Sequence, residues 1–176
     1  MEVSLLDLND TVMLKEFCNK CKALNWINNS SLDRMNVDMV KQKQGAFFGV
    51  IEAGELVSIS GCYRFNEISP NAWRIFYRSA TLPGKAKNPG LHRGTGLRGR
   101  LYIDQFIQFT KSSDLYLTTN SNNKEQSTMS RYHKSLSLES EMKDSYVHKL
   151  GVISLYGIDQ TIWKLDLTDY YDRINK

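Results

Sequence analysis

The sequence predicts an α/β (α+β) fold whose elements follow the order β-α-α-β-β-β-α-β-α-β-β. Three observations support this prediction. Apolar residues recur at helical spacing near the N-terminus, strand-like runs fill the middle, and helix and strand patterns alternate in the second half. The chain has 176 residues, enough for one domain with a substantial core. Because it shows no internal repeat, low-complexity segment or long linker, we expect a single domain over residues 1–176.

A short strand and a helix are predicted first. Residues 2–8 read as the strand, and residues 9–24 as a helix that Asp10 or Thr11 can cap. Its apolar residues recur every three or four positions, at Leu14, Phe17, Cys21 and Leu24.

The second predicted helix covers residues 28–45. Ser30 or Ser31 is a suitable cap, and Gly45 is a stop signal. Its apolar positions are Leu32, Met35, Met39 and Val40.

Three strand-like runs follow. Residues 46–65 contain two of them around a turn at residues 53–54, which is a hairpin pattern. Residues 72–82 form the third, and Pro83 ends it because proline cannot donate to a sheet ladder. A loop with two prolines and two glycines spans residues 83–93.

The second half alternates helix and strand. An amphipathic helix follows the loop, residues 114–120 read as a strand, and residues 123–136 read as a polar helix. Residues 150–167 read as two strands around a turn at residues 157–159. The amphipathic helix presents one face built from Tyr102, Ile103, Phe106, Ile107 and Thr110.

Positive charge is concentrated in one stretch. The chain has a net charge of +4, and residues 68–103 contain no Asp or Glu. The cations of this stretch are Arg74, Arg78, Lys85, Lys87, Arg93, Arg98 and Arg100. Such a patch attracts polyanions, either the phosphates of a cofactor or a nucleic-acid backbone. A solvated loop without a ligand is the third interpretation.

The composition favours a cytoplasmic protein. No run of eighteen apolar residues exists, so we expect no transmembrane helix and no membrane partner. The first ten residues lack the basic and apolar regions of a signal peptide. Three cysteines, an odd number, argue against a disulfide framework and fit a reducing compartment.

The stretch over residues 88–109 places four glycines and three arginines directly before the amphipathic helix. A helix N-terminus offers unpaired N–H groups and the positive end of the helix dipole. Glycines allow close approach of the backbone to an anion, and Arg93 and Arg98 can add contacts to phosphate. These features indicate a diphosphate site, with a plain strand-to-helix connection as the alternative. The motif matches neither a P-loop nor a dinucleotide-binding fingerprint.

The element order and this loop resemble the GNAT superfamily of acyl-CoA-dependent N-acyltransferases. That family places a phosphate loop, Q/R-x-x-G-x-G/A, between its fourth strand and third helix. Residues 91–96 read Leu-His-Arg-Gly-Thr-Gly, so both glycines match while Leu91 replaces the usual Gln or Arg.

Two further family positions have loose counterparts. Asn120, Asn122 or Asn123 corresponds to an Asn that follows the fifth strand, and Tyr132 to a Tyr near the end of the next helix. The family ending Y-x-x-x-G-F is absent, because Leu and Ser follow at residues 136–137.

The resemblance implies a mixed, mostly antiparallel central sheet flanked by helices, with a V-shaped split between the fourth and fifth strands. Acetyl-CoA, or another acyl-CoA, is the implied co-substrate. Its pantetheine arm would pair with the backbone of residues 80–82, and its diphosphate would sit on amides of residues 93–98. The implied cofactor-binding residues are Ala80, Thr81, Leu82, His92, Arg93, Gly94, Thr95, Gly96, Leu97, Arg98 and Asn123.

The catalytic residues are less well marked. The resemblance implies that Tyr132 protonates the departing thiolate, although a packing tyrosine fits the same pattern. Many family members carry a catalytic carboxylate on the fourth strand, and residues 73–82 contain none. Glu67 and Glu52 are the nearest candidates for the base by strand position, and ordered water is the alternative.

Other motifs are weaker. Cys18 and Cys21 share a helix face but lack the further ligands of a zinc site, so we expect structural cysteines and no metal. His133, beside Tyr132, makes no triad recognisable from sequence. Residues 73–80 interleave arginines with aromatic residues, which can stack on bases or form a strand with two faces.

The leading hypothesis is an N-acyltransferase that moves an acetyl or other acyl group from acyl-CoA to a small-molecule or peptide amine. A non-catalytic GNAT-like binding or assembly module is the first alternative, favoured by Leu91 and by the missing strand carboxylate. A nucleic-acid-binding protein that uses the basic stretch over residues 74–100 is the second. The acceptor would be selected by the first two helices and the loop at residues 66–71.

Overall fold

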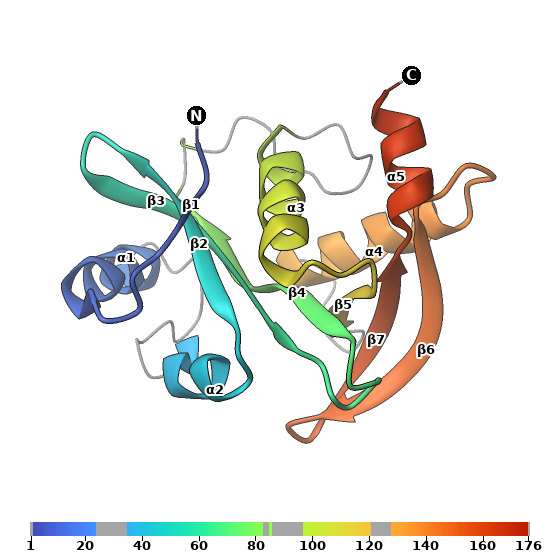
Figure 1. Cartoon of the computed structure of the whole chain (residues 1–176), viewed down its shortest axis with the longest axis horizontal. Helices are drawn as coiled ribbons and strands as arrows, with labels where there is room; N and C mark the ends of the chain where they lie inside the picture. Colours follow the sequence, from blue (N-terminus) through green and yellow to red (C-terminus); the bar gives the residue numbers. More distant parts are fainter. Residues whose placement is uncertain (1, 24–34, 83–84, 86–96, 121–127, 176) are drawn as a thin grey trace.

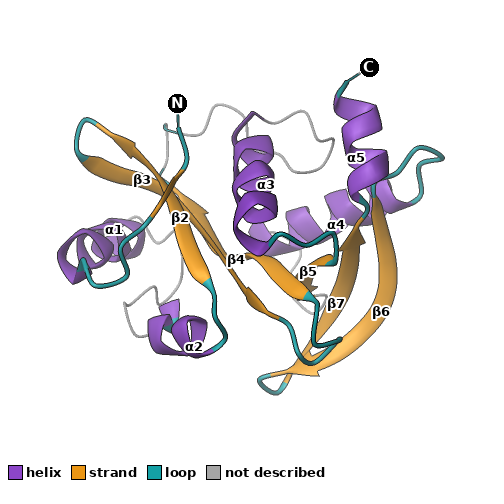
Figure 2. Cartoon of the chain, viewed as in Figure 1, coloured by secondary structure: helices purple, strands orange, loops and turns teal. Residues whose placement is uncertain are grey.

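A seven-stranded sheet in the order β1-β2-β3-β4-β5-β7-β6 forms the centre of the protein (Figure 1). The computed structural model describes residues 2–23, 35–82, 85, 97–120 and 128–175. Every neighbouring pair of strands is antiparallel except β4 and β5, which are parallel. Helices flank the sheet (Figure 2), so the predicted mixed, mostly antiparallel sheet is confirmed.

The predicted order of elements is also confirmed, with one helix added at the C-terminus. The strands are β1 (Ser4–Leu5), β2 (Ala46–Glu52), β3 (Glu55–Arg64), β4 (Trp73–Thr81), β5 (Leu115–Asn120), β6 (Val147–Leu155) and β7 (Ile158–Leu165). The helices are α1 (Thr11–Ala23), α2 (Val37–Gln42), α3 (Leu97–Thr110), α4 (Thr128–Ser140) and α5 (Leu167–Ile174).

Several predicted boundaries differ from the structure. The first strand is limited to Ser4–Leu5. Helix α2 begins only at Val37, after Asn36 in a left-handed conformation, while residues 24–34 lie outside the described part. The last hairpin turns at Tyr156 and Gly157, both with positive φ, rather than at residues 157–159. Two consecutive residues with positive φ match the twist of a tight hairpin.

Helix α5 was not predicted. The Asp166 side chain accepts a hydrogen bond from the Asp169 amide at 3.0 Å and so caps the helix, and Tyr170 is fully buried. A cap residue directly after the last strand was the available sequence signal.

Helix α3 packs on one face of the sheet, and Figure 1 shows α1 and α2 on the other. The buried residues of α3 include Tyr102, Ile103 and Phe106, as the amphipathic pattern predicted. Phe106 meets Phe48 of β2 edge to face at 5.6 Å. Because neighbouring strand residues face opposite ways, Phe47 instead lies beside the ring of Tyr77 on the other face.

A V-shaped split separates β4 from β5. Within the described chain, these strands pair only at Trp73 with Leu115 and at Arg74 with Tyr116. Strand β4 then continues to Thr81 and β5 to Asn120 without further pairing between them. We call residues 75–81 the β4 arm and residues 117–120 the β5 arm. The split predicted from the GNAT resemblance is therefore present.

Strand β4 bends just beyond its last pair with β5. Its register with β3 shifts on both sides of Gly61, and Phe76 and Arg78 adopt positive φ angles of 55° and 51°. Non-glycine residues rarely take this conformation, and bulges of this kind turn a strand away from its neighbour. The bulges thus direct the β4 arm away from β5.

The cysteines are free and buried. Burial raises the pKa of the Cys21 thiol to about 11 and that of Cys62 to about 12, so both stay protonated and unreactive at neutral pH. None of the helices in the described residues is long and apolar enough to span a membrane.

Gly45 provides a test of the packing between α2 and the sheet. A Cβ atom there would lie 2.2 Å from the Cys62 carbonyl oxygen and 2.8 Å from Val40. We predict that Gly45→Ala lowers the free energy of unfolding by about 1–3 kcal/mol, the usual scale for overpacking. Urea titration checks this, with Ser154→Ala at an exposed β6 position as control. An unchanged or raised stability, as a Gly→Ala change without a clash would give, would show that the backbone there yields easily.

Candidate functional site

The guanidinium of Arg74 bridges the split where β4 and β5 part. Its Nη1 donates to the hydroxyl of Tyr63 on β3 at 2.6 Å. Its Nη2 donates to the side-chain oxygen of Gln160 on β7 at 3.0 Å, and also to the Thr118 hydroxyl on β5. One side chain therefore joins four strands, and only 8% of its surface is exposed.

Aromatic rings enclose this cation. The guanidinium carbon lies 5.4 Å from the ring centre of Tyr77, 5.7 Å from Tyr63 and 5.9 Å from Phe65. Ring faces attract cations and replace part of the lost hydration. Burial raises the pKa of the Tyr63 hydroxyl well above its usual value despite the opposing charge of Arg74, so the phenol stays neutral. The partners of Arg74 among the described residues are thus neutral groups.

The β4 arm carries the residues predicted to pair with pantetheine. Ala80 and Thr81 pair with Ile59 and Ser58 of β3, and the Leu82 amide donates to a β3 carbonyl at 2.8 Å. Their partners lie on the β3 side, so the other edge of this segment borders the split. This position is compatible with backbone pairing to pantetheine, which stays a prediction.

Helix α3 is tied to the β4 arm by hydroxyl groups. The Tyr102 hydroxyl donates to the Ser58 oxygen at 3.0 Å. The same Ser58 oxygen lies 2.8 Å from the Thr81 hydroxyl and 3.2 Å from the Ala80 carbonyl oxygen. Ser58 is buried, so these bonds hold the first turns of α3 against the arm. Sequence reasoning missed this network because Ser58 and Tyr102 are 44 positions apart.

Helix α4 is tied to the β5 arm. Nδ1 of His133 lies 2.8 Å from the Thr119 hydroxyl, which also accepts from the indole N–H of Trp163 at 2.8 Å. Partial burial and the nearby charge of Lys149 lower the pKa of His133, so the ring is neutral at neutral pH. Tyr132, the predicted general acid, is the preceding residue of the same helix.

The two candidate bases lie at opposite ends of the split. Glu67 follows the end of β3 near the closed end, where Lys43 binds it at 2.6 Å. Burial, the largest single cause, opposes ionisation of Glu67, but hydrogen bonds from Lys43 and from the Glu67 backbone, with the charges of Lys43 and Arg74, together outweigh it and lower the pKa. Glu52 ends β2 beside the hairpin turn and lies 3.6 Å from Lys85. Both carboxylates are therefore engaged by lysines, and their catalytic role stays a prediction.

The predicted phosphate loop ends where α3 begins. Helix α3 starts at Leu97, directly after the Gly-rich motif, as a diphosphate site at a helix N-terminus requires. Leu97 and Arg98 are its first two residues. His92, Arg93, Gly94, Thr95, Gly96 and Asn123 lie outside the described residues.

The structure describes the side chains of four cations of the basic stretch, Arg74, Arg78, Lys85 and Arg100, the last of which is exposed on α3. Arg74 is buried, and Arg78 is exposed with its guanidinium 5.4 Å from the Tyr77 ring. Lys85 lies beside Glu52. This arrangement gives the stacking interpretation of residues 73–80 no support.

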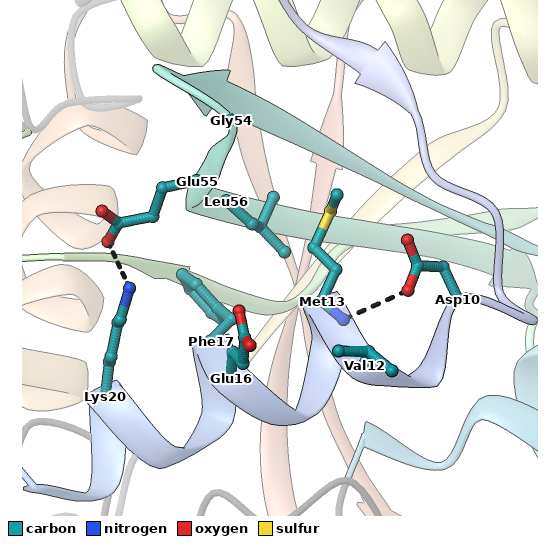
Figure 3. Close-up of a pocket in the computed structure, with 9 residues that line it drawn as sticks. All are labelled: Asp10, Val12, Met13, Glu16, Phe17, Lys20, Gly54, Glu55 and Leu56. Carbon is teal, nitrogen blue, oxygen red and sulfur yellow. Dashed lines mark hydrogen bonds and ion pairs between the residues drawn. The ribbon is translucent and has the colours of Figure 1, made fainter.

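A hollow of about 220 Å³ lies away from the split, between α1 and the β2–β3 turn (Figure 3). Lys20 and Glu55 form an ion pair at 2.9 Å on its rim, and Asp10 caps α1 through the Met13 amide at 3.2 Å. Asp10, Lys20 and Glu55 thus have partners within the fold.

Near α5, His148, Asp166 and Asp169 bring their donor atoms within 4.8 Å of one another. Asp166 is already used as the helix cap.

Tyr102→Phe tests the link between α3 and the β4 arm. We predict a loss of about 1 kcal/mol in stability, the usual contribution of one hydrogen bond, together with a several-fold loss of CoA affinity because the arm is less well held. Calorimetry with CoA and a thermal melt check both. Tyr116→Phe is the matched control, since it loses a hydrogen bond to Asp114 at the closed end. Equal CoA affinity in the two variants would show that the link has no role in binding.

Comparison with known proteins supports the fold. No family model and no curated protein matches the chain. Among solved structures, aminoglycoside acetyltransferase AAC(6')-Ib in complex with coenzyme A and kanamycin matches with a TM-score of 0.62 and 12% identity, over 99% of both chains. Aminoglycoside 6'-N-acetyltransferase from Enterococcus faecium matches with a TM-score of 0.57 and 14% identity, over 93% of this chain and 95% of that one.

A ribosomal-protein-alanine N-acetyltransferase from Brucella melitensis matches with a TM-score of 0.51 and 12% identity, over 94% of this chain and 99% of that one. The similarity spans nearly the whole chain in each case. The chain therefore has the fold of the GNAT acetyltransferases.

Proposed function

We propose that the protein is an N-acyltransferase that moves an acetyl group from acetyl-CoA to an amine. The observation that carries this proposal is the parallel pair of β4 and β5, which ends after two residues and opens beside a helix that starts directly after a Gly-rich loop. Solved structures of the same fold include acetyltransferases with bound coenzyme A.

The two arms of the split have different tasks in this proposal. The β4 arm pairs with the pantetheine chain, and the amides at the start of α3 receive the diphosphate. The β5 arm carries α4 through Thr119 and His133, and thereby positions the helix that bears Tyr132. Holding an amine against a thioester in this way supplies much of the rate enhancement.

The reaction requires two proton transfers. The amine attacks the thioester carbonyl, loses a proton, and expels the CoA thiolate, which takes up a proton. We assign the second transfer to Tyr132. Since Glu52 and Glu67 are both engaged by lysines and β4 carries no carboxylate, we expect water to accept the first proton.

Tyr132→Phe tests this assignment. The change removes one hydroxyl, so turnover should fall about 100-fold or more if the phenol protonates the thiolate. Affinity for acetyl-CoA should change little, because the lost interaction forms mainly in the transition state. Release of free thiol from acetyl-CoA with a panel of amines, and calorimetric titration with CoA, measure the two quantities.

The comparison of the parent with Tyr132→Phe has three informative outcomes. Equal turnover would make Tyr132 a packing residue. A parent that binds acetyl-CoA and acylates no amine, peptide or aminoacyl group would support the non-catalytic binding module, which the absence of a carboxylate on β4 favours. A parent that does not bind CoA would contradict the transferase proposal itself.

A further inference from the structure

Arg74 is a buried charge without a counter-ion among the described residues. A guanidinium is charged at every physiological pH and has five N–H donors. Three of these reach Tyr63, Thr118 and Gln160, all of them neutral acceptors. The remaining two, on Nε and Nη1, have no acceptor in the part of the chain that the structure describes. Burying such a charge without an opposite charge is costly.

The nearby carboxylates are already neutralised. Glu67 is held by Lys43 at 2.6 Å. Asp114 lies 3.5 Å from Lys164 and accepts a hydrogen bond from Tyr116 at 2.7 Å. Neither lies within ion-pair distance of Arg74. The charge of Arg74 is only the last of the causes that lower the pKa of Glu67, so these carboxylates neutralise it weakly.

The Arg74 guanidinium lies at the closed end of the split, where it can affect which acceptor binds. Arg74 is the last β4 residue that pairs with β5, and its side chain reaches Thr118, two residues beyond the last paired position of β5. The guanidinium thus crosses the gap at the closed end of the split. Strand β4 adds a second cation, Arg78, and carries neither Asp nor Glu. A substrate with several ammonium groups would meet like charges here, which is unfavourable at low dielectric.

We infer that the amine acceptor carries an anionic group, a carboxylate or a phosphate, which binds Arg74 while the amine faces the thioester. The inference rests on the proposed function and specifies its substrate class. It separates this protein from the aminoglycoside acetyltransferases that share its fold, because aminoglycosides carry several amines and would be repelled. A charge-assisted hydrogen bond to a buried guanidinium is among the stronger polar contacts in proteins.

Matched pairs of amines test the inference. L-alanine with L-alaninamide, β-alanine with its amide, and O-phosphoethanolamine with ethanolamine each differ by one anionic group. The first two pairs test a carboxylate and the third a phosphate, and kanamycin serves as the polycation. Binding to the parent is measured by calorimetry and ligand-observed NMR, both with and without saturating CoA. We expect the anionic member of at least one pair to bind 10-fold or more tightly than its partner and than kanamycin.

Variants then assign the preference to Arg74. The preference should disappear in Arg74→Gln and persist in Arg78→Gln, a matched loss of charge at an exposed position of the same strand. A preference that survives Arg74→Gln overturns the inference. The inference is also overturned if the two members of every pair bind equally well, or if kanamycin binds more tightly than every anionic amine. If Arg74→Gln does not fold, Arg74→Lys takes its place, because lysine keeps the charge but has fewer N–H donors than arginine. The pair preference should then fall, and an unchanged preference overturns the inference.

The CoA titration keeps the two proposals distinct. Failure of the parent to bind CoA contradicts the transferase proposal, whereas loss of the pair preference in Arg74→Gln and not in Arg78→Gln reports on the anion site, whether or not CoA binds.

Discussion

The bridge made by Arg74 is the interaction on which the candidate site depends. Strands β4 and β5 share only two paired positions, too few to fix the angle between two diverging arms. The guanidinium supplies the missing connection, because it binds Tyr63 on β3, Thr118 on β5 and Gln160 on β7 from a single position. It holds the closed end of the split while the bulges around Gly61 bend β4 away.

Each arm of the split in turn carries one helix. The Ser58 hydroxyl connects the β4 arm to α3 through Tyr102, and the Thr119 hydroxyl connects the β5 arm to α4 through His133. These contacts are 2.8–3.0 Å long and buried or partly buried, so the placement of the two helices follows the geometry of the sheet. Each arm and the helix tied to it therefore form one connected unit.

The features of the fold and the site that could be predicted are those that leave a local pattern in the sequence. The element order and the Gly-rich motif before α3 are visible within short windows of sequence. The split and the mixed sheet were predicted only through the resemblance to the GNAT family that these two features carry. The Arg74 bridge was not predicted, since its partners are 11, 44 and 86 residues away. From the sequence, Arg74 was interpreted as one cation of a basic stretch and as one of the arginines interleaved with aromatic residues over residues 73–80. Helix α5 was missed because a cap such as Asp166 is a weak signal directly after a strand.

The central claim is that acyl-CoA binds between the arms of the split, and hydrogen–deuterium exchange tests it most directly. Saturating CoA should slow amide exchange in residues 75–82 and in the first turn of α3. Exchange in α1 and at the β2–β3 turn, around the separate hollow of Figure 3, should not change. Slower exchange confined to that hollow, or no change in either arm, would contradict the account.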